Sequence, residues 1–506
     1  MWRDAQAVDI RIQPAIEADV CVIAEGCYPY VSGGVSNWID WLIRSHPELT
    51  FSVLAILPSK PTSGPRFERP GNLRGVHELY LDTRTVGGSG PWPKVAPEEM
   101  AALLGRLLQN GDPTDFRRLI GLLGGGNRRP SLDAILNSPQ GWEAMCSFYK
   151  VMPHSSFLGY FWAWRTLVGG LLHMLSFPLP PARIYHAVST GYAGLLAARA
   201  AVETGRDAVI TEHGIYSNER RIEILMADWI ANSIDNGLDL SDSRTDIREF
   251  WAASFDSFAR IAYSISKEIT ALYANNQVFQ RALGAADDKL RVIPNGVDVE
   301  RFSSRKPVPH AEPTIAFVGR VTPIKDVQTF LDVADILRQQ FPTLRALVIG
   351  PMDEDPEYAA ACLNEATSRG LDSVVTFTGP ADVREYLARI DILVLTSISE
   401  ALPLVILEAG AAGVPCVTTD VGACRELLEG SISGLEEPQG GVVVPVGASE
   451  EMAATIAALL ADPELRKRYG AGLHARVNKH YRAEVIADAY TQLYRRHIVP
   501  ADSKEA

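Results

Sequence analysis

Cysteine is scarce in this sequence, and the few cysteines are scattered. The chain of 506 residues contains six, with no CxxC pair and no spacing typical of a disulfide framework or a zinc site. A disulfide-stabilised fold is therefore excluded, and the thiols favour a reducing cytoplasm. No cluster of His and Cys offers metal ligands either, so we expect no metal site and no cofactor.

Positive charge is also in deficit. Lys and Arg number 48 against 61 Asp and Glu, which gives a net charge of −13. A chain this acidic is a poor binder of nucleic acid, but a local group of cations can still hold a phosphorylated ligand such as a nucleotide. The apolar fraction of 47% is typical of a globular protein.

Long uninterrupted apolar runs are missing. The N-terminal sequence MWRDAQAVDIRIQP lacks the apolar segment of a secretory signal peptide, so none is expected. The segment 157–177 comes nearest to a membrane span, but Arg165 and His173 interrupt it and Gly169-Gly170 weakens it. We predict that this segment is a buried or peripheral helix.

The length of the chain exceeds what one core supports and predicts two domains. The N-terminal domain is expected over 1–293, with a helical insertion at about 60–180 and completion by 483–500. Residues 215–284 are predicted to be mostly helical, with a loop around 239–246, and 303–313 to be a linker. Apolar runs predict the strands of this domain at 20–24, 51–57, 184–188, 209–212 and 290–294.

The C-terminal domain, expected over 294–482, alternates strands and helices regularly. Helical stripes separate the short apolar runs, and this alternation predicts a doubly wound α/β domain of the Rossmann type. The strands are predicted at 314–318, 345–349, 373–377, 391–395, 415–418 and 442–444.

Chemistry is concentrated in the stretch 391–413, where a strand turns through a polar loop into a helix. Glu400 precedes the helix and Glu408 lies about one turn inside it. Ligands of open α/β sheets bind at the carboxyl ends of strands, and the free amides of a helix start attract phosphate or sugar oxygens. This stretch is predicted to be half of a nucleotide-sugar site. Two carboxylates also fit the acid/base pair of a hydrolase, and the residues alone leave both interpretations open.

Two cations, Arg320 and Lys325, lie in the loop after the strand 314–318. A guanidinium fork and an ammonium can neutralise a diphosphate leaving group in place of a metal. The acidic run 353–355 formally fits the Asp-x-Asp pattern of metal-dependent sugar transferases. Because Pro356 follows it, we predict instead an exposed loop or the cap of a helix that begins near Glu357.

The N-terminal domain adds glycines and histidines at comparable places. Gly33 and Gly34 lie at the entrance of a helix, where backbone amides can approach a ligand closely. His186 and His213 fall at the carboxyl ends of predicted strands, which directs both towards one crevice. Asn295 lies in the turn that follows the last strand of this domain.

The segment from Glu400 to Glu408 resembles the E-x7-E motif of retaining glycosyltransferases of family 4. Other family features occur in the same order and cover most of the chain: Gly33-Gly34, 293–298, Gly319-Arg320 with Lys325, and 420–426. Within the family, four phrases are similar to the branch that makes the Pel exopolysaccharide: 25–34, 211–216, 350–356 and 395–400.

The resemblance implies the α/β GT-B fold, with two facing doubly wound Rossmann-like domains, a donor cleft between them and a C-terminal helix (about 483–496) that crosses back. It implies a cytoplasmic, metal-independent transferase that moves a hexose or hexosamine from a UDP-sugar, with UDP-glucose favoured, to a growing exopolysaccharide. Peripheral association with inner-membrane components of the Pel synthase is a further implication. Nucleic acid is not an expected partner.

Roles for individual residues also follow from the resemblance. Arg320 and Lys325 would hold the diphosphate and Glu408 the ribose, while Glu400 and the amides after it would hold the donor sugar. His213 would be the active-site histidine, and Gly33-Gly34 would approach the donor from the opposite domain. The resemblance also implies that Gly319, Ala401, Leu402, Pro403, Leu404 and Val405 belong to the donor site and that His186 and Asn295 are possible cleft residues.

The mechanism implied by the family is retention by front-face attack. The acceptor hydroxyl adds on the side from which UDP leaves, its proton passes to the departing phosphate, and no protein nucleophile is required. Two other functions remain open at this point. They are a UDP-sugar epimerase or hydrolase on the same fold, and a UDP-sugar-binding scaffold within a polysaccharide synthase complex.

Overall fold

The computed structural model describes most of the chain as two compact α/β units. Unit 1 comprises 1–270, 280–291 and 492–506, and unit 2 comprises 271–279 and 292–491. The predicted loop around 239–246 and most of the predicted linker 303–313 lie outside the described residues. The described residues are 17–31, 33–81, 90–124, 129–150, 157–216, 220–221, 247–303, 312–430 and 438–498.

The division into units differs from the prediction at 271–279, at 292–293 and in the last helix. Residues 271–279 belong to unit 2 although they precede the last strand of unit 1. Leu272 and Tyr273 pack in a hydrophobic core of unit 2, and the amide of Ala274 donates to the Glu426 carboxylate at 3.1 Å. Buried apolar contacts therefore hold residues 271–279 in unit 2. No local sequence pattern indicates this assignment.

Unit 1 is built on a seven-stranded sheet in the order β3-β2-β1-β4-β5-β6-β7. The pairs from β3 to β5 are parallel, and β2 is buried along its whole length, as expected for a strand covered on both faces. The strands are β1 (Ala18–Glu25), β2 (Phe51–Leu57), β3 (Leu73–Tyr80), β4 (Ala182–Ala187), β5 (Asp207–Glu212), β6 (Glu268–Ala271) and β7 (Leu290–Val292).

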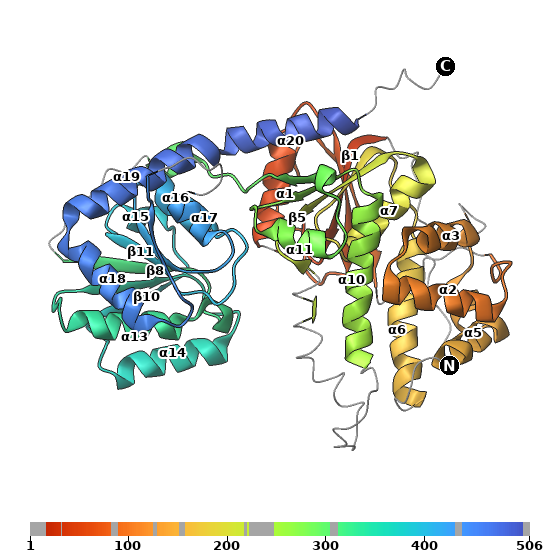
Figure 1. The fold of residues 1–506 in the computed structure, drawn as a ribbon, viewed down its shortest axis with the longest axis horizontal. Helices are drawn as coiled ribbons and strands as arrows, with labels where there is room; N and C mark the ends of the chain where they lie inside the picture. Colours follow the sequence, from red (N-terminus) through yellow and green to blue (C-terminus); the bar gives the residue numbers. More distant parts are fainter. Residues whose placement is uncertain are drawn as a thin grey trace. The chain divides into compact units, whose positions relative to one another are not determined.

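Two of these strands correct the prediction. β3 lies within the proposed insertion 60–180, so the inserted helices begin after Tyr80, and β6 lies within the segment predicted to be helical. Helices pack on the sheet and beside it (Figure 1). They are α1 (Gly34–Arg44), α2 (Pro97–Asn110), α3 (Pro113–Leu123), α4 (Leu132–Leu136), α5 (Pro139–Tyr149), α6 (Phe157–Ser176), α7 (Tyr192–Thr204) and α10 (Ile247–Ile265). A further helix, α11 (Asn276–Ala282), begins in unit 2 and ends in unit 1.

The inserted helices share one hydrophobic core with the sheet of unit 1, which includes residues of α2, α5, α6 and α10. Gly111 ends α2 at φ 68°, and a Cβ there would lie 2.5 Å from the carbonyl oxygen of Ser257 in α10. The close approach of these helices therefore requires glycine. α6 buries most of its length but leaves Leu158 and Trp162 in its first turns exposed. Within the described part of the chain, no helix combines the length and hydropathy needed to cross a bilayer.

Unit 2 contains a six-stranded, fully parallel sheet in the order β10-β9-β8-β11-β12-β13. All six predicted strands are present, each within two residues of its predicted position. They are β8 (Thr314–Val318), β9 (Arg345–Ile349), β10 (Val375–Gly379), β11 (Ile392–Leu395), β12 (Cys416–Thr419) and β13 (Gly441–Val444).

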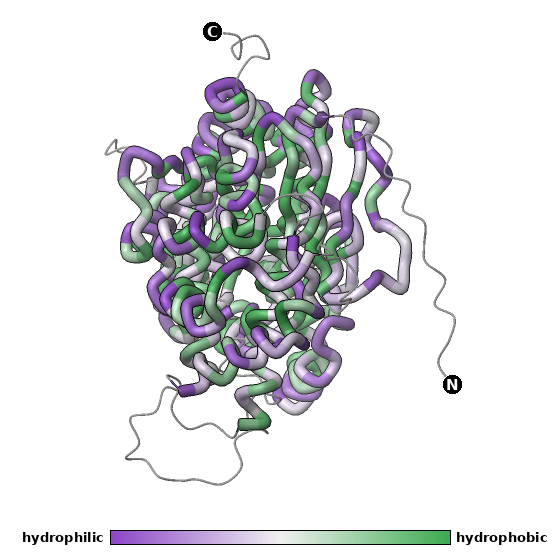
Figure 2. Tube along the Cα trace, turned by 90° about the vertical axis from the view of Figure 1, so that its right-hand side faces the viewer, coloured by the Kyte–Doolittle hydropathy of each residue, from purple (hydrophilic) through white to green (hydrophobic). Residues whose placement is uncertain are grey.

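Helices cover both faces of this sheet and form two separate cores. One core includes residues of α13, α14 and α18, and the other includes residues of α16, α17 and α19. Figure 2, which views the chain from the side of α2, α3 and α5 in unit 1, shows hydrophobic stretches, coloured green, mostly inside and hydrophilic ones, coloured purple, mostly at the periphery. The helices are α12 (Val299–Ser303), α13 (Val327–Arg338), α14 (Pro356–Ser368), α15 (Arg384–Leu387), α16 (Leu404–Ala411), α17 (Cys424–Glu429), α18 (Ser449–Ala461) and α19 (Pro463–His480).

The last helix, α20 (Ala483–His497), contributes to both units. It begins in unit 2, and from Gln492 onward it belongs to unit 1. The predicted C-terminal helix is therefore present, but unit 1 takes residues from 492 rather than from 483. Tyr490, Leu493 and Tyr494 on this helix are fully buried.

Candidate functional site

The loops after two adjacent strands of unit 2 meet at the carboxyl end of the sheet. β8 and β11 pair in parallel, so the loop that carries Lys325 lies beside the loop that carries Glu400. The Lys325 ammonium forms an ion pair with the Glu400 carboxylate, and the side chains are only 19% and 11% exposed. Thr396 Oγ1 donates to the Lys325 carbonyl at 3.0 Å, and the Ile398 amide donates to the Ile324 carbonyl at 2.9 Å. The two loops thus form one rigid wall.

Glu400 is held from several sides. Ser397 Oγ donates to its carboxylate at 2.7 Å, and Thr419 Oγ1 in β12 donates to the Ser397 carbonyl at 2.6 Å. Gly422 approaches the Glu400 carbonyl oxygen so closely that a Cβ would lie 2.3 Å away, with φ at 52°. A preorganised carboxylate of this kind can accept hydrogen bonds from sugar hydroxyls without rearranging.

The N-terminus of α16 follows this loop. Pro403 is the N-cap and residues 404–411 form the helix, so the amides of the first turn, at Leu404 and Val405, lie where a helix has unsatisfied donors. Glu408 lies just over one turn into the helix. Burial raises the pKa of Glu408 to about 7, although Arg301 opposes the shift and Asp382 adds to it. Glu408 therefore changes charge in the physiological range.

Arg320 lies in the same loop as Lys325 but in a different environment. Its guanidinium forms an ion pair with Glu354, and the side chains are 51% and 49% exposed. Asp355 caps α14 by accepting the amide of Tyr358 at 3.0 Å, and the helix begins at Pro356. The prediction that the acidic run caps a helix is confirmed. In the described part of the chain, no group of three or more His, Cys, Asp or Glu could hold a metal ion, and metal independence stays a prediction.

In unit 1, His213 follows the end of β5 and packs against the indole of Trp38, with ring centroids 4.5 Å apart. Its Nε2 atom is buried and has no hydrogen-bond partner among the described residues. Burial lowers the pKa of His213 to about 4, so the imidazole is neutral at physiological pH. It can exchange a hydrogen bond with a ligand, but it carries no charge there.

A carboxylate that the sequence analysis did not single out, Glu25, ends β1. It accepts the Tyr216 hydroxyl and the amide of Tyr192, the latter at 3.1 Å, and lies 3.5 Å from the Arg220 guanidinium. Burial raises the pKa of Glu25, while Tyr216 and Arg220 lower it. Its position at the carboxyl end of β1, an interior strand of the sheet, was the signal that could have identified it.

His186 lies in the core of unit 1, and the prediction that it lines a cleft is wrong. It is fully buried, its Nδ1 lies 2.8 Å from the Tyr494 hydroxyl, and its Nε2 lies 2.8 Å from Thr211 Oγ1. The last four residues of β4 are all buried, and because successive side chains face opposite sides of a sheet, both faces are covered at His186. His186 therefore joins β4, β5 and α20 inside unit 1.

The structure neither supports nor contradicts a ligand role for the remaining predicted residues, Gly33, Gly34 and Asn295. Gly33 and Gly34 are exposed at the start of α1, and a Cβ on either would meet nothing within 4 Å, so internal packing does not require glycine there. Asn295 is largely buried in the turn after β7, with an Oδ1 atom that has no partner among the described residues. A ligand role for these three residues stays a prediction.

The structure brings together the predicted donor residues of unit 2. Gly319 lies at the end of β8, where its amide donates to the Ile349 carbonyl at 2.9 Å. The ion pair of Lys325 and Glu400 joins the loops that follow β8 and β11. The segment 401–405 and Glu408 continue from the same loop into α16. Gly33, Gly34 and His213 belong to unit 1.

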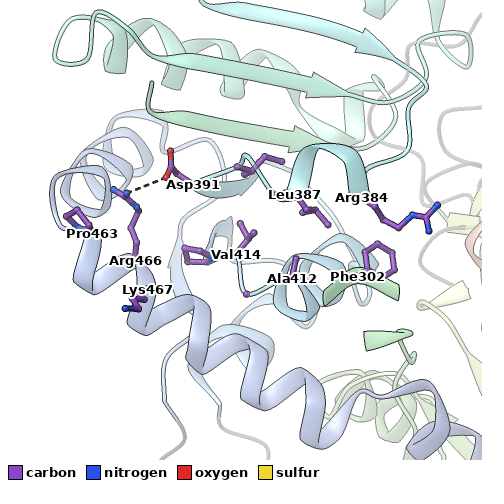
Figure 3. A pocket seen from close by; sticks show the side chains of 13 residues that line it. Phe302, Arg384, Leu387, Asp391, Ala412, Val414, Pro463, Arg466 and Lys467 are labelled. Carbon is purple, nitrogen blue, oxygen red and sulfur yellow. Dashed lines mark ion pairs between the residues drawn. The ribbon is translucent and has the colours of Figure 1, made fainter. Parts of the chain in front are cut away.

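A cavity of about 260 Å³ lies at the opposite, amino end of the unit 2 sheet. Figure 3 shows Asp391, which precedes β11, paired with Arg466 at 3.3 Å, and Leu387, Val414 and Phe302 around the apolar middle. None of the predicted donor residues is among those that line it. This cavity is therefore separate from the candidate donor site.

Two protein families match the chain in succession. Residues 18–288 match the family described as "Domain of unknown function (DUF3492)", and residues 312–462 match "Glycosyl transferases group 1". The second match covers strands β8 to β13 and therefore the predicted donor residues of unit 2.

Curated relatives match a limited part of the chain. D-inositol 3-phosphate glycosyltransferase of Saccharomonospora viridis is 29% identical over 231 residues, which is 42% of this chain and 52% of that protein. Phosphatidyl-myo-inositol mannosyltransferase of Mycobacterium leprae is 30% identical over 210 residues, which is 40% of this chain and 52% of that protein. The chain thus spans about half the length of the curated relatives it matches.

Solved structures resemble the chain over nearly its whole length. Sucrose-phosphate synthase from Thermosynechococcus elongatus has a TM-score of 0.57 and 16% identity, over 94% of this chain and 98% of that one. Anabaena Alr3699/HepE in complex with UDP has a TM-score of 0.57 and 15% identity, over 94% and 100%. At these identities the likeness shows the fold, which is two Rossmann-like domains of the GT-B type.

Proposed function

We propose that this chain, which belongs to the family described as "Domain of unknown function (DUF3492)" and carries a glycosyl transferase group 1 domain, is a retaining glycosyltransferase that uses a UDP-sugar donor. The observation that carries this proposal is the wall formed by Lys325, Glu400 and the N-terminus of α16. It combines a cation, a fixed carboxylate and free amides at the carboxyl ends of adjacent strands, where α/β sheets bind nucleotides.

The leaving diphosphate sets the electrostatic requirement of the reaction. Lys325 and Arg320 are the groups that would neutralise it, and helix α16 adds the partial positive charge of its N-terminus. Each charge-assisted hydrogen bond contributes about 1.5–3 kcal/mol. These groups supply the charge that a metal provides in metal-dependent transferases, which supports metal independence.

The proposed transfer needs no protein nucleophile. The acceptor hydroxyl oxygen forms a bond to the anomeric carbon on the face from which UDP departs, and the bond between that carbon and the phosphate oxygen breaks. The hydroxyl proton passes to the departing phosphate. Glu400 and the backbone amides of Ala401, Leu402, Leu404 and Val405 hold the sugar. Glu408 holds the ribose, and neutral His213 can hydrogen-bond the transferred sugar.

The donor and acceptor are inferred from relatives and from the resemblance. Anabaena Alr3699/HepE, a protein of similar fold, has a crystal structure in complex with UDP-glucose, so we propose UDP-glucose as the donor to test first, followed by UDP-GlcNAc and UDP-GalNAc. The proposed acceptor is a growing exopolysaccharide of the Pel type, as expected of a PelF-like enzyme. We place the reaction in the cytoplasm, beside the inner-membrane components of the synthase.

Calorimetry against a panel of UDP-sugars tests the proposal, followed by transfer assays with each donor that binds. We expect Arg320→Ala to weaken donor binding. A matched control is Arg345→Ala, because Arg345 is an exposed, ion-paired arginine at the amino end of β9. A chain that binds none of the UDP-sugars would contradict the proposal. Release of free sugar or an epimerised donor, without transfer to any glycan, would instead identify a hydrolase or an epimerase.

A further inference from the structure

Both cations proposed to bind the diphosphate are occupied by carboxylates in the structure, but one of these carboxylates has no assigned role. Glu400, the partner of Lys325, belongs to the proposed sugar site. Glu354, the partner of Arg320, comes from a different loop, after β9. It lies in the acidic run whose neighbour Asp355 caps α14, so the cap does not depend on Glu354 itself.

The backbone ties the loop of Glu354 to the loop of Arg320. The Gly319 amide donates to the Ile349 carbonyl at 2.9 Å, and the Val321 amide donates to the Pro351 carbonyl at 3.0 Å. Gly350 lies so close that a Cβ would be 1.9 Å from the Gly319 carbonyl oxygen, and its φ of 152° also disfavours a side chain. Main-chain contacts therefore hold the loop of Glu354 beside the loop of Arg320, within reach of an ion pair between the two side chains.

We propose that Glu354 is an affinity-setting residue that competes internally with the donor diphosphate for the Arg320 guanidinium. This inference rests on the proposed function, because it takes Arg320 as a diphosphate ligand. A diphosphate and a carboxylate both present paired anionic acceptor oxygens, so they exclude each other at one face of the guanidinium. Binding of UDP then requires Arg320 to exchange Glu354 for phosphate oxygens.

Because the pair is exposed to water, little free energy is needed to break it. Both side chains are about half exposed, and exposed ion pairs of this kind are weak because water screens them. Removing the competitor is therefore expected to tighten UDP binding by about twofold to fivefold. The same competition keeps Arg320 from holding weak inorganic anions, since a single phosphate lacks the nucleoside that anchors UDP elsewhere in the site.

The test is calorimetry of the full chain and of Glu354→Gln with UDP, with uridine and with pyrophosphate. We expect Glu354→Gln to bind UDP and pyrophosphate about twofold to fivefold more tightly and uridine equally well. Asp353→Asn is the matched control, because it removes the same charge from an exposed position in the same loop and should change UDP affinity less. Raising the ionic strength should reduce the difference between the wild-type chain and Glu354→Gln.

Each other result overturns a defined part of the proposal. Weaker UDP binding by Glu354→Gln would mean that Glu354 positions Arg320 for the donor. An equal gain in Asp353→Asn would reduce the effect to general charge, and an equal gain for uridine would remove the link to the diphosphate. Unchanged UDP affinity in Glu354→Gln overturns this inference alone, whereas failure of the wild-type chain to bind UDP overturns the proposed function with it.

Discussion

The two ion pairs at the end of β8 use the same chemistry in different surroundings. Lys325 and Glu400 are mostly buried and are joined by Ser397, whereas Arg320 and Glu354 are about half exposed. Breaking a buried pair leaves a charge in a medium that solvates it poorly, while breaking an exposed pair returns both charges to water. The buried pair thus stabilises the folded loops, whereas a ligand anion can replace one partner of the exposed pair.

The largest effect is expected from Lys325→Ala, which breaks the buried pair. We expect transfer to fall by at least about 100-fold, because the diphosphate loses a charge-assisted contact and Glu400 loses its orienting cation. The free energy of unfolding should also fall by about 1–3 kcal/mol, since Glu400 keeps Ser397 but has lost its counter-charge. Initial rates and thermal unfolding check both effects. An unchanged rate would remove Lys325 from the site.

A smaller loss is expected from Arg320→Ala, which breaks the exposed pair. Transfer should fall by about 10- to 100-fold, corresponding to one charge-assisted contact of roughly 1.5–3 kcal/mol, while the melting temperature stays the same. Arg345→Ala, which removes another exposed pair from unit 2, should change neither quantity. A clear drop in melting temperature for Arg320→Ala would contradict the contrast between the pairs.

Glu408 extends the comparison to a carboxylate whose charge depends on pH. With a pKa raised to about 7, it is largely protonated at pH 6 and ionised at pH 8. If the ribose hydroxyls donate to its carboxylate, affinity for UDP-glucose should rise by up to about tenfold between these values. Glu408→Gln should abolish this rise. The raised pKa also means that Glu408 favours the folded state at low pH, and this contribution is lost as the pH rises through about 7.

The smallest expected effect is the coupling free energy within each ion pair, which compares the two pairs directly. Double-mutant cycles on the free energy of unfolding should give a coupling of about 0.2–1 kcal/mol for Arg320 with Glu354. The coupling for Lys325 with Glu400 should exceed it, because those partners are buried. Equal couplings would show that exposure does not separate the two pairs.

The framework of unit 2 could be predicted because its strands are short apolar runs between amphipathic helices. Lys325 and Glu400 were both predicted as donor-site residues, but their ion pair was not, because it depends on the strand order that places β11 beside β8. The partner of Arg320 was not predicted either, because it depends on how the loop after β9 folds back. In sequence, Glu354 was one acid in an exposed run.

Unit 1 was less predictable for identifiable reasons. β3 (LRGVHELY) lies at the edge of the sheet and is only partly buried, so its apolar pattern is weak. β6 has four residues directly after the long helix α10 and is too short to signal a strand. His186 was misplaced because a strand-end rule does not say which side chains point inward within one residue of the end.

The hydrogen bond between His186 and Tyr494 has a consequence for the order in which the protein is made. Tyr494 packs against His46 and Phe51, and two residues later Arg496 pairs with Glu268. A ribosome synthesises nearly all of unit 2 before these residues appear. Unit 1 can therefore complete its core only after the second unit has been translated, so the domain that begins first is the one that finishes last.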